Sequence, residues 1–156
     1  MLADWILKRI EVEKSKNNLK GADLSDAKLM QAKLSDANLR DADLSGAYFI
    51  KADLANADLG NSDLSRAVLS EANLKGANLG GANLKEAFLN EADLQGADLE
   101  EAELEDTDLR GADLRQVKNL TCEQIEWAVI DKSTQFPEYI QLAWTDEDTF
   151  NCNDNC

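Results

Sequence analysis

Leucine recurs at every fifth position from Leu24 to Leu114, and Phe49 is its only substitute. This period suits neither regular element. It would carry the leucines around an α-helix, and in a straight strand it would place them alternately on opposite faces. The chain must therefore turn a corner once in every repeat, and this requirement determines the fold before any motif is considered.

The repeats divide each five-residue unit into an inner and an outer side. Nineteen copies run from Ala22 to Gln116, and seventeen begin with alanine, the exceptions being Ser62 and Thr107. Strand alternation puts this small residue and the leucine on one side and the polar residues on the other. Small and large apolar groups should then fill a packed column without room for a ligand. Six glycines occupy the last repeat position, where a corner can require a positive φ: Gly21, Gly46, Gly76, Gly81, Gly96 and Gly111.

Repeats of the form Ala-(Asp/Asn)-Leu-x-x resemble the pentapeptide-repeat family, and they cover about 95 of the 156 residues. This resemblance implies an all-β solenoid, a right-handed, four-sided β-helix with one repeat on each side. Residues twenty positions apart would then stack between neighbouring coils. The nineteen repeats would make about five coils, a rod on the order of 20–25 Å long at the usual strand spacing.

The segments outside the repeats hold all three tryptophans, Trp5, Trp127 and Trp144. An open coil end presents unpaired N–H and C=O groups, so both flanks are expected to act as caps. The expected parts are an N-terminal cap over 1–21, the β-helix over 22–116, a C-terminal helical cap and packed segment over 117–144, and a loose acidic tail over 145–156.

The C-terminal flank carries a helix signal. Thr121 and Gln124 form a capping-box pattern. A short helix should therefore cover the last coil, with four residues on its inner face: Cys122, Ile125, Ala128 and Val129.

The N-terminal flank gives two readings. The helical spacing includes Leu2, Trp5, Ile6 and Ile10, whereas Ile10 and Val12 could instead alternate as in a strand, so the type of this cap stays open. Trp5 is expected to be buried in either case. The short apolar run has no basic segment before it, which predicts neither a secretory signal nor a membrane span and favours a cytoplasmic protein. A basic amphipathic segment that touches a membrane surface is the alternative to an end cap.

Three cysteines, Cys122, Cys152 and Cys156, fit no secreted disulfide framework, so reduced thiols are expected. The spacing of Cys152 and Cys156 is not a zinc pattern, and neither a metal nor another cofactor is expected. Histidine is absent, which removes the usual general base. Stacked carboxylates such as Asp23 and Asp43 would lie on a convex ladder that has no cleft for a substrate. The sequence therefore predicts a protein that is not an enzyme.

The C-terminal repeats are strongly acidic. Ten acidic residues and no basic one lie between Lys85 and Arg110. Such a surface disfavours direct nucleic-acid binding and can attract basic proteins, or it can serve only to keep the solenoid soluble. In the family that these repeats resemble, quinolone-resistance proteins form acidic dimeric rods that imitate DNA and bind DNA gyrase, so gyrase-directed mimicry is an alternative function. We call the following set the acidic end: Glu100, Glu101, Glu103, Glu105, Asp106 and Asp108.

One side of the coil differs from the others at the position before leucine. Asp and Asn prevail elsewhere, but this side carries three apolar residues at an interval of twenty, which should stack as an outward stripe. Two further apolar residues lie one position past the leucine site and widen it. We call this set the apolar stripe: Tyr48, Val68, Phe88, Met30 and Ile50.

Three partners for the apolar stripe stay open: segment 136–144 folding back over Phe88 and Val68, a second copy in a homodimer, or another protein. The function expected from the sequence is a non-enzymatic protein-interaction or scaffold module that binds through the apolar stripe or the flanks. The residues do not identify its protein partner.

Overall fold

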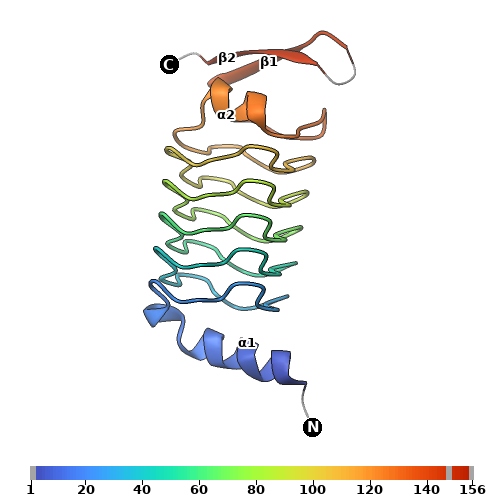
Figure 1. The fold of residues 1–156 in the computed structure, drawn as a ribbon. Helices are drawn as coiled ribbons and strands as arrows, with labels where there is room; N and C mark the ends of the chain where they lie inside the picture. The colour runs from blue at the N-terminus through green and yellow to red at the C-terminus, as the bar shows by residue number, and fades with distance from the viewer. Residues whose placement is uncertain (1–2, 147–148, 155–156) are drawn as a thin grey trace.

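Stacked coils form a column with a different cap at each end (Figure 1). The computed structural model describes residues 3–146 and 149–154. Helix α1 (Asp4–Lys14) and the short 3-10 helix η1 (Lys16–Asn18) precede the coils. Helix α2 (Cys122–Trp127) and a hairpin of strands β1 (Ile140–Trp144) and β2 (Phe150–Asp154) follow them.

Parallel bridges join residues twenty positions apart, beginning with Asp23 and Asp43 and continuing to Asp98 and Lys118. Each bridge involves a single residue because the chain turns after every fifth position. In the first bridge, Leu24 N–H donates to Asp43 O at 2.8 Å, and Asp43 N–H donates to Ala22 O at 3.0 Å. Four repeats therefore complete one coil, as the resemblance implies.

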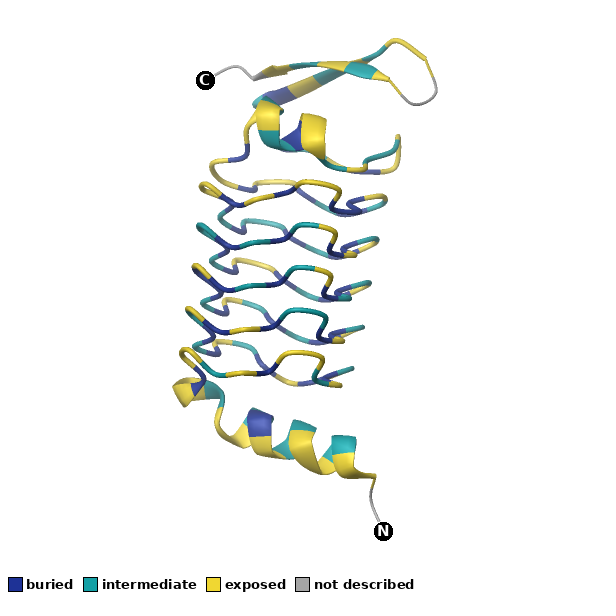
Figure 2. Ribbon diagram, in the orientation of Figure 1, coloured by how far each residue is buried: buried dark blue, intermediate teal, exposed yellow. Residues whose placement is uncertain are grey.

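The leucines and alanines fill the interior of the column. None of the central residues from Leu24 to Leu114 is more than 4% exposed, and the buried residues follow the inner side of every coil in Figure 2. Ser62 and Thr107, the two repeats that lack alanine, are also buried. Their hydroxyl groups donate to Leu59 O and Leu84 O, each at 2.7 Å. These bonds remove the cost of an unpaired buried hydroxyl.

The corners adopt the left-handed backbone conformation. Every fifth residue from Gly21 to Gln116 has a positive φ, including the six glycines of the last repeat position. The corner prediction is therefore confirmed, and it extends to the acidic, asparagine, glutamine and basic residues that occupy the same position at φ values of 54° to 60°.

Aspartate and asparagine are favoured before leucine because they hold the corner. Asp43 Oδ1 accepts Ser45 N–H at 3.0 Å, which is an Asx-type bond within one repeat. Asparagines stacked on aspartates also link neighbouring coils: Asn73 Nδ2 donates to Asp53 Oδ1 at 2.9 Å. The amide separates carboxylates that would otherwise stack on one another.

Helix α1 closes the first coil with its side chains. Arg9 Nη1 donates to Met30 O at 3.0 Å, and Glu13 Oε1 accepts Lys33 N–H at 2.9 Å. These side chains hydrogen-bond to backbone groups of the first coil that would pair with a preceding coil in the middle of the column.

The N-terminal cap is helical, which decides between the two readings of this flank. Trp5 is only half-buried, so the prediction of its burial is wrong. The start of α1 diverges from the coils (Figure 1), and the Trp5 ring lies beside Arg9, whose guanidinium carbon is 5.9 Å from the ring centroid. Among residues 3–21, the buried ones are Val12 and Leu19.

Helix α2 begins with the predicted capping box. Gln124 N–H donates to Thr121 Oγ1 at 3.3 Å, and Thr121 N–H donates to Gln124 Oε1 at 2.8 Å. Ile125 is buried as expected, but the helix ends at Trp127 and Val129 is 43% exposed. The placement of Val129 on the inner helical face is therefore wrong, because the chain has already returned to the coil register and bridges Asp108.

The segment after α2 packs on the C-terminal end of the column. Tyr139 Oη donates to Val117 O at 3.0 Å and accepts Leu120 N–H at 3.1 Å. Strands β1 and β2 then pair in antiparallel register, with Trp144 opposite Phe150. The expectation of a loose tail over 145–156 is wrong for residues 150–154, because backbone pairing orders them.

A disulfide joins Cys122 of α2 to Cys152 of β2, with 5.6 Å between the Cα atoms. The expectation of reduced thiols is therefore wrong for these two residues, which the hairpin brings together over 30 positions of sequence. Cys156 lies outside the described residues. Neither α-helix in the described part of the chain is long and apolar enough to cross a membrane.

Replacing Leu69 with alanine should lower the free energy of unfolding by about 2–5 kcal/mol, because the rigid stack closes poorly around a cavity. Leu7→Ala is the matched control, since Leu7 is 51% exposed on α1 whereas Leu69 is fully buried. The control should cost less than about 1 kcal/mol. Urea denaturation measures both values, and equal losses would contradict the assignment of inner and outer positions.

The disulfide should stabilise the C-terminal cap. Removing a crosslink that closes a loop of this size costs about 2–4 kcal/mol, so dithiothreitol should lower the denaturation midpoint of the wild type. A Cys122→Ser/Cys152→Ser variant should resemble the reduced wild type and should not respond to the reductant. An unchanged wild-type midpoint after reduction, with thiol release verified by alkylation, would contradict this role.

Candidate protein-docking site

The apolar stripe forms on one side of the column, as its spacing predicts. Parallel bridges join Tyr48 to Val68 and Val68 to Phe88, so the three residues occupy consecutive coils. Tyr48 is 41% exposed and Phe88 is 48% exposed, with the half-buried Val68 between them. The ladder therefore displays two aromatic side chains on one outward side.

Met30 and Ile50 are both half-buried. They follow leucine and phenylalanine directly and lie next to the corner, and their carbonyl groups accept bonds from Arg9 and Gln31 respectively. They contribute less outward surface than Tyr48 and Phe88. The aromatic residues are accordingly the main members of the apolar stripe.

Segment 136–144 does not cover the apolar stripe. Phe136 and Tyr139 pack against the core, and Tyr139 bonds to the backbone at the last coil. The hairpin continues across the C-terminal end of the column (Figure 1). The interpretation that this segment folds back over Phe88 and Val68 is wrong, because its aromatic residues are held at the coil end.

Val129 extends the same side beyond the repeats. It bridges Asp108, which in turn bridges Phe88, and it is 43% exposed. Sequence spacing missed this residue because it lies 21 positions after Asp108 rather than twenty. The insertion of α2 shifts the register by one residue. Val129 shows that the apolar character of this side resumes after Asp108.

Asp108, which belongs to the acidic end, is buried between these apolar neighbours. Its carboxylate accepts Arg110 Nε at 2.9 Å and Arg110 Nη2 at 2.7 Å. The hydrogen bonds from the Arg110 side chain lower the pKa of Asp108 below its ordinary value. This carboxylate is ion-paired, so it contributes less outward negative potential than its sequence position predicts.

The other five members of the acidic end are exposed. Lys85 Nζ lies 2.9 Å from Glu103 Oε2 and 3.6 Å from Glu105 Oε2. The hydrogen bond with Glu103 is the main cause of a raised pKa at Lys85. Among the described residues, three members have no ion pair with a base: Glu100, Glu101 and Asp106. The unpaired negative charge is thus smaller than the count of acids indicates.

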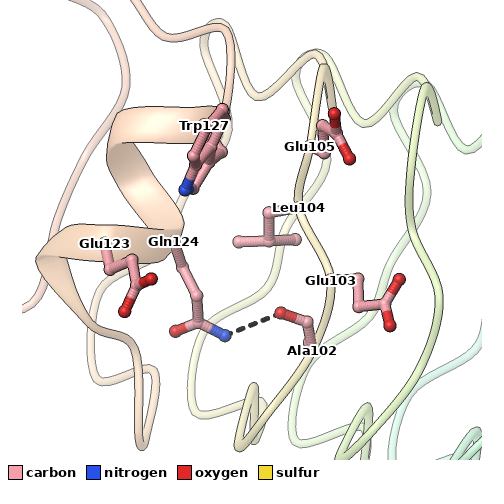
Figure 3. Close-up of a pocket in the computed structure, with 7 residues that line it drawn as sticks. All are labelled: Ala102, Glu103, Leu104, Glu105, Glu123, Gln124 and Trp127. Atoms are coloured by element: carbon pink, nitrogen blue, oxygen red, sulfur yellow. Dashed lines mark hydrogen bonds between the residues drawn. The ribbon is translucent and has the colours of Figure 1, made fainter.

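A cavity of about 270 Å³ lies between α2 and the last repeats (Figure 3). Gln124 Nε2 forms one wall by donating to Leu99 O at 2.8 Å and to Ala102 O at 2.9 Å. Trp127, which is 61% exposed, forms another. The repeat pattern gives no signal for this cavity, because α2 interrupts the pattern there. Its complete lining is Ala102, Glu103, Leu104, Glu105, Glu123, Gln124 and Trp127.

Within residues 3–146 and 149–154, no group of three or more cysteine or acidic side chains is arranged to hold a metal ion. The sequence spacing also brought Cys152 and Cys156 into question as a metal-binding pair. Cys156 is outside the described residues, and the sulfur of Cys152 is in the disulfide.

Comparisons with known proteins agree with the repeat architecture. The family model for pentapeptide repeats matches residues 15–46, 47–85 and 77–116, with 8 copies. A pentapeptide repeat protein from the thylakoid lumen of Arabidopsis thaliana is 30% identical, with a TM-score of 0.55, and the match covers 72% of this chain and 75% of that one. No curated protein sequence matches this chain.

Two other solved structures are similar over most of this chain. HetL, a pentapeptide repeat protein involved in heterocyst differentiation regulation in Nostoc, is 35% identical with a TM-score of 0.42, over 78% of this chain and 56% of HetL. QnrB1, a plasmid-mediated fluoroquinolone resistance protein, is 19% identical with a TM-score of 0.49, over 80% of this chain and 86% of QnrB1. The matched repeats, the coil register of twenty residues and the first of these relatives place the chain in the pentapeptide-repeat family, whose fold is a right-handed β-helical solenoid.

Proposed function

We propose that this protein is a non-enzymatic binding module that docks a partner protein through the apolar stripe. The observation that carries this proposal is the exposure of Tyr48 and Phe88, at 41% and 48%, on one side of a rigid column. Aromatic residues dominate the energy of many interfaces, since they bury a large area and lose little conformational freedom on binding. Val129 extends the surface toward the C-terminal cap.

The dimensions of this side support a protein partner. At the usual strand spacing, Tyr48 and Phe88 are two coils or about 10 Å apart. A partner that reaches both residues must present a surface rather than a single group. The interior is filled by leucine and alanine, so the coils offer no internal cavity for a substrate. Pentapeptide-repeat proteins are in general structural or interaction modules, which agrees with a binding role.

Imitation of DNA by the acidic end is the second candidate function, with DNA gyrase or another DNA-binding protein as the target. The observation that favours it is the exposure of Glu100, Glu101 and Asp106 without a basic partner among the described residues. Binding of this kind depends on charge and therefore weakens as salt concentration rises. Docking through aromatic side chains depends much less on salt.

The disulfide bears on the compartment of the protein. The sequence favours the cytoplasm, where thiols are usually kept reduced. The bond between Cys122 and Cys152 supports a compartment that maintains disulfides. We therefore propose that the protein acts in an oxidising compartment. The lumenal origin of the Arabidopsis relative is consistent with it but belongs to that protein.

The stripe can be tested by capturing partners from the native cell extract with immobilised protein at low and high salt. A Tyr48→Asp/Phe88→Asp variant should capture at least tenfold less partner than the wild type at both salt concentrations, because burial of the new carboxylates has a large desolvation cost. Leu7→Asp is the matched control, since Leu7 is at least as exposed, at 51%, but lies on α1. Thermal denaturation establishes that both variants are folded.

Three outcomes would contradict docking of a partner protein through the stripe. Equal capture by the wild type and the double variant would exclude the stripe as the contact. A partner that salt releases and the double variant retains would favour the acidic end. A wild-type dimer in sedimentation experiments that the double variant abolishes would assign the stripe to self-association instead.

A further inference from the structure

One backbone N–H group in the ladder that joins the coils has no hydrogen-bond acceptor among the described residues. Every central residue from Leu24 to Leu114 except Leu104 donates its N–H to a carbonyl of the next coil, at N···O distances of 2.7–3.0 Å. Leu104 N–H has no hydrogen-bond acceptor among the described residues. The regular geometry of the other repeats directs this N–H toward the end of the column, where α2 lies.

The gap arises because α2 replaces the next strand on this side of the coil. Glu123, which is twenty positions after Glu103, belongs to the helix rather than to a bridge. The helix provides hydrogen-bond partners only for the backbone groups on either side of Leu104. Gln124 Nε2 donates to Ala102 O, and Trp127 O accepts Asp106 N–H at 2.9 Å. Pairing is therefore restored on both sides of Leu104 but not at Leu104 itself.

The cavity described above lies at this gap. Figure 3 shows Leu104 of the coil and Gln124 and Trp127 of α2 around the same space. Its volume of about 270 Å³ is below the range of roughly 300–1,000 Å³ that is usual for small-molecule sites. The space therefore suits one side chain and the backbone beside it better than a larger ligand.

Three carboxylates line the cavity, from Glu103, Glu105 and Glu123. Lys85 contacts the first two and is the only base that forms an ion pair with any of the three among the described residues. Three carboxylates and one ammonium group leave a net charge of −2 at the cavity when all four groups are ionised. The exposed ring of Trp127 adds an aromatic surface that attracts cations.

We propose that this cavity binds an extended peptide segment of a partner protein that carries a lysine or arginine. A peptide carbonyl accepts the N–H of Leu104 and takes the place of the absent coil, which is recognition by strand addition at a single position. The basic side chain lies against Trp127 among the three glutamates. Charge excludes an acidic peptide, and the unpaired backbone donor favours a peptide over a simple amine. The site uses none of the residues of the apolar stripe.

Titration of the 15N-labelled protein with an acetylated, amidated Gly-Thr-Arg-Thr-Gly peptide tests this proposal by NMR. The Leu104 amide proton should move downfield as its hydrogen bond forms. Trp127→Ala should weaken binding by about 3- to 30-fold through loss of the cation–π contact. Trp127 is exposed, so this variant should remain folded. Glu123→Gln should also weaken binding, whereas Glu91→Gln, an exposed acid that does not line the cavity, should not.

The peptide controls separate recognition of the backbone from recognition of charge alone. A peptide with norleucine in place of arginine should bind at least tenfold more weakly, and methylguanidine should not shift the Leu104 amide. Equal binding of the norleucine peptide, an unmoved Leu104 amide at millimolar arginine peptide, or full affinity in Trp127→Ala would each overturn the proposal. The Tyr48→Asp/Phe88→Asp variant should bind the arginine peptide as the wild type does, so failure here is distinguishable from failure of docking through the stripe.

Discussion

The hydrogen bond that nearly every central residue donates to the next coil is the interaction on which the rest of the structure depends. It fixes the interval of twenty residues, and this interval stacks like residues on like along each side. A ladder of this kind is complete only in its middle, because each end leaves donors and acceptors without partners. The two flanks supply those partners in different ways. Helix α1 uses Arg9 and Glu13, whereas the C-terminal segment uses the amide of Gln124 and the hydroxyl of Tyr139.

The same stacking explains why the repeats leave few positions for function. Inner positions must be small or leucine to fill the column, and corner positions adopt positive φ. The position before leucine usually holds its corner through an aspartate or asparagine oxygen, as Asp43 does with Ser45. A tyrosine or phenylalanine there gives up this corner bond and places an aromatic ring in water. Tyr48 and Phe88 therefore depart from the local rule without a structural benefit in the isolated chain, which is typical of residues that serve binding.

Periodicity made the column predictable from the sequence, because one local rule repeats nineteen times. The buried leucines and the glycine corners follow from it. The alignment of Tyr48 with Phe88 needed in addition the coil of four repeats that the resemblance to the pentapeptide-repeat family implies. The capping box predicted α2 for a similar reason, since its signal is local. Other features depend on contacts between distant segments that no period records. The disulfide, the pairing of β1 with β2, and the return of Val129 to the coil register were missed on that account. Trp5 was misplaced because its helical spacing gives no information on the distance between α1 and the first coil.

The C-terminal cap borders both proposed binding surfaces, the apolar stripe and the cavity at Leu104. Trp127 ends α2, and Val129 joins the apolar side two residues later. The position of α2 therefore sets both the opening of the cavity at Leu104 and the upper limit of the apolar side. The disulfide from Cys122 fixes the first turn of this helix to the hairpin. Loss of that crosslink would act on the cavity through α2, whereas Tyr48 and Phe88 are held by coils that the crosslink does not reach. The two surfaces consequently differ in physical character as well as in position, one being apolar and rigid and the other charged and dependent on the cap.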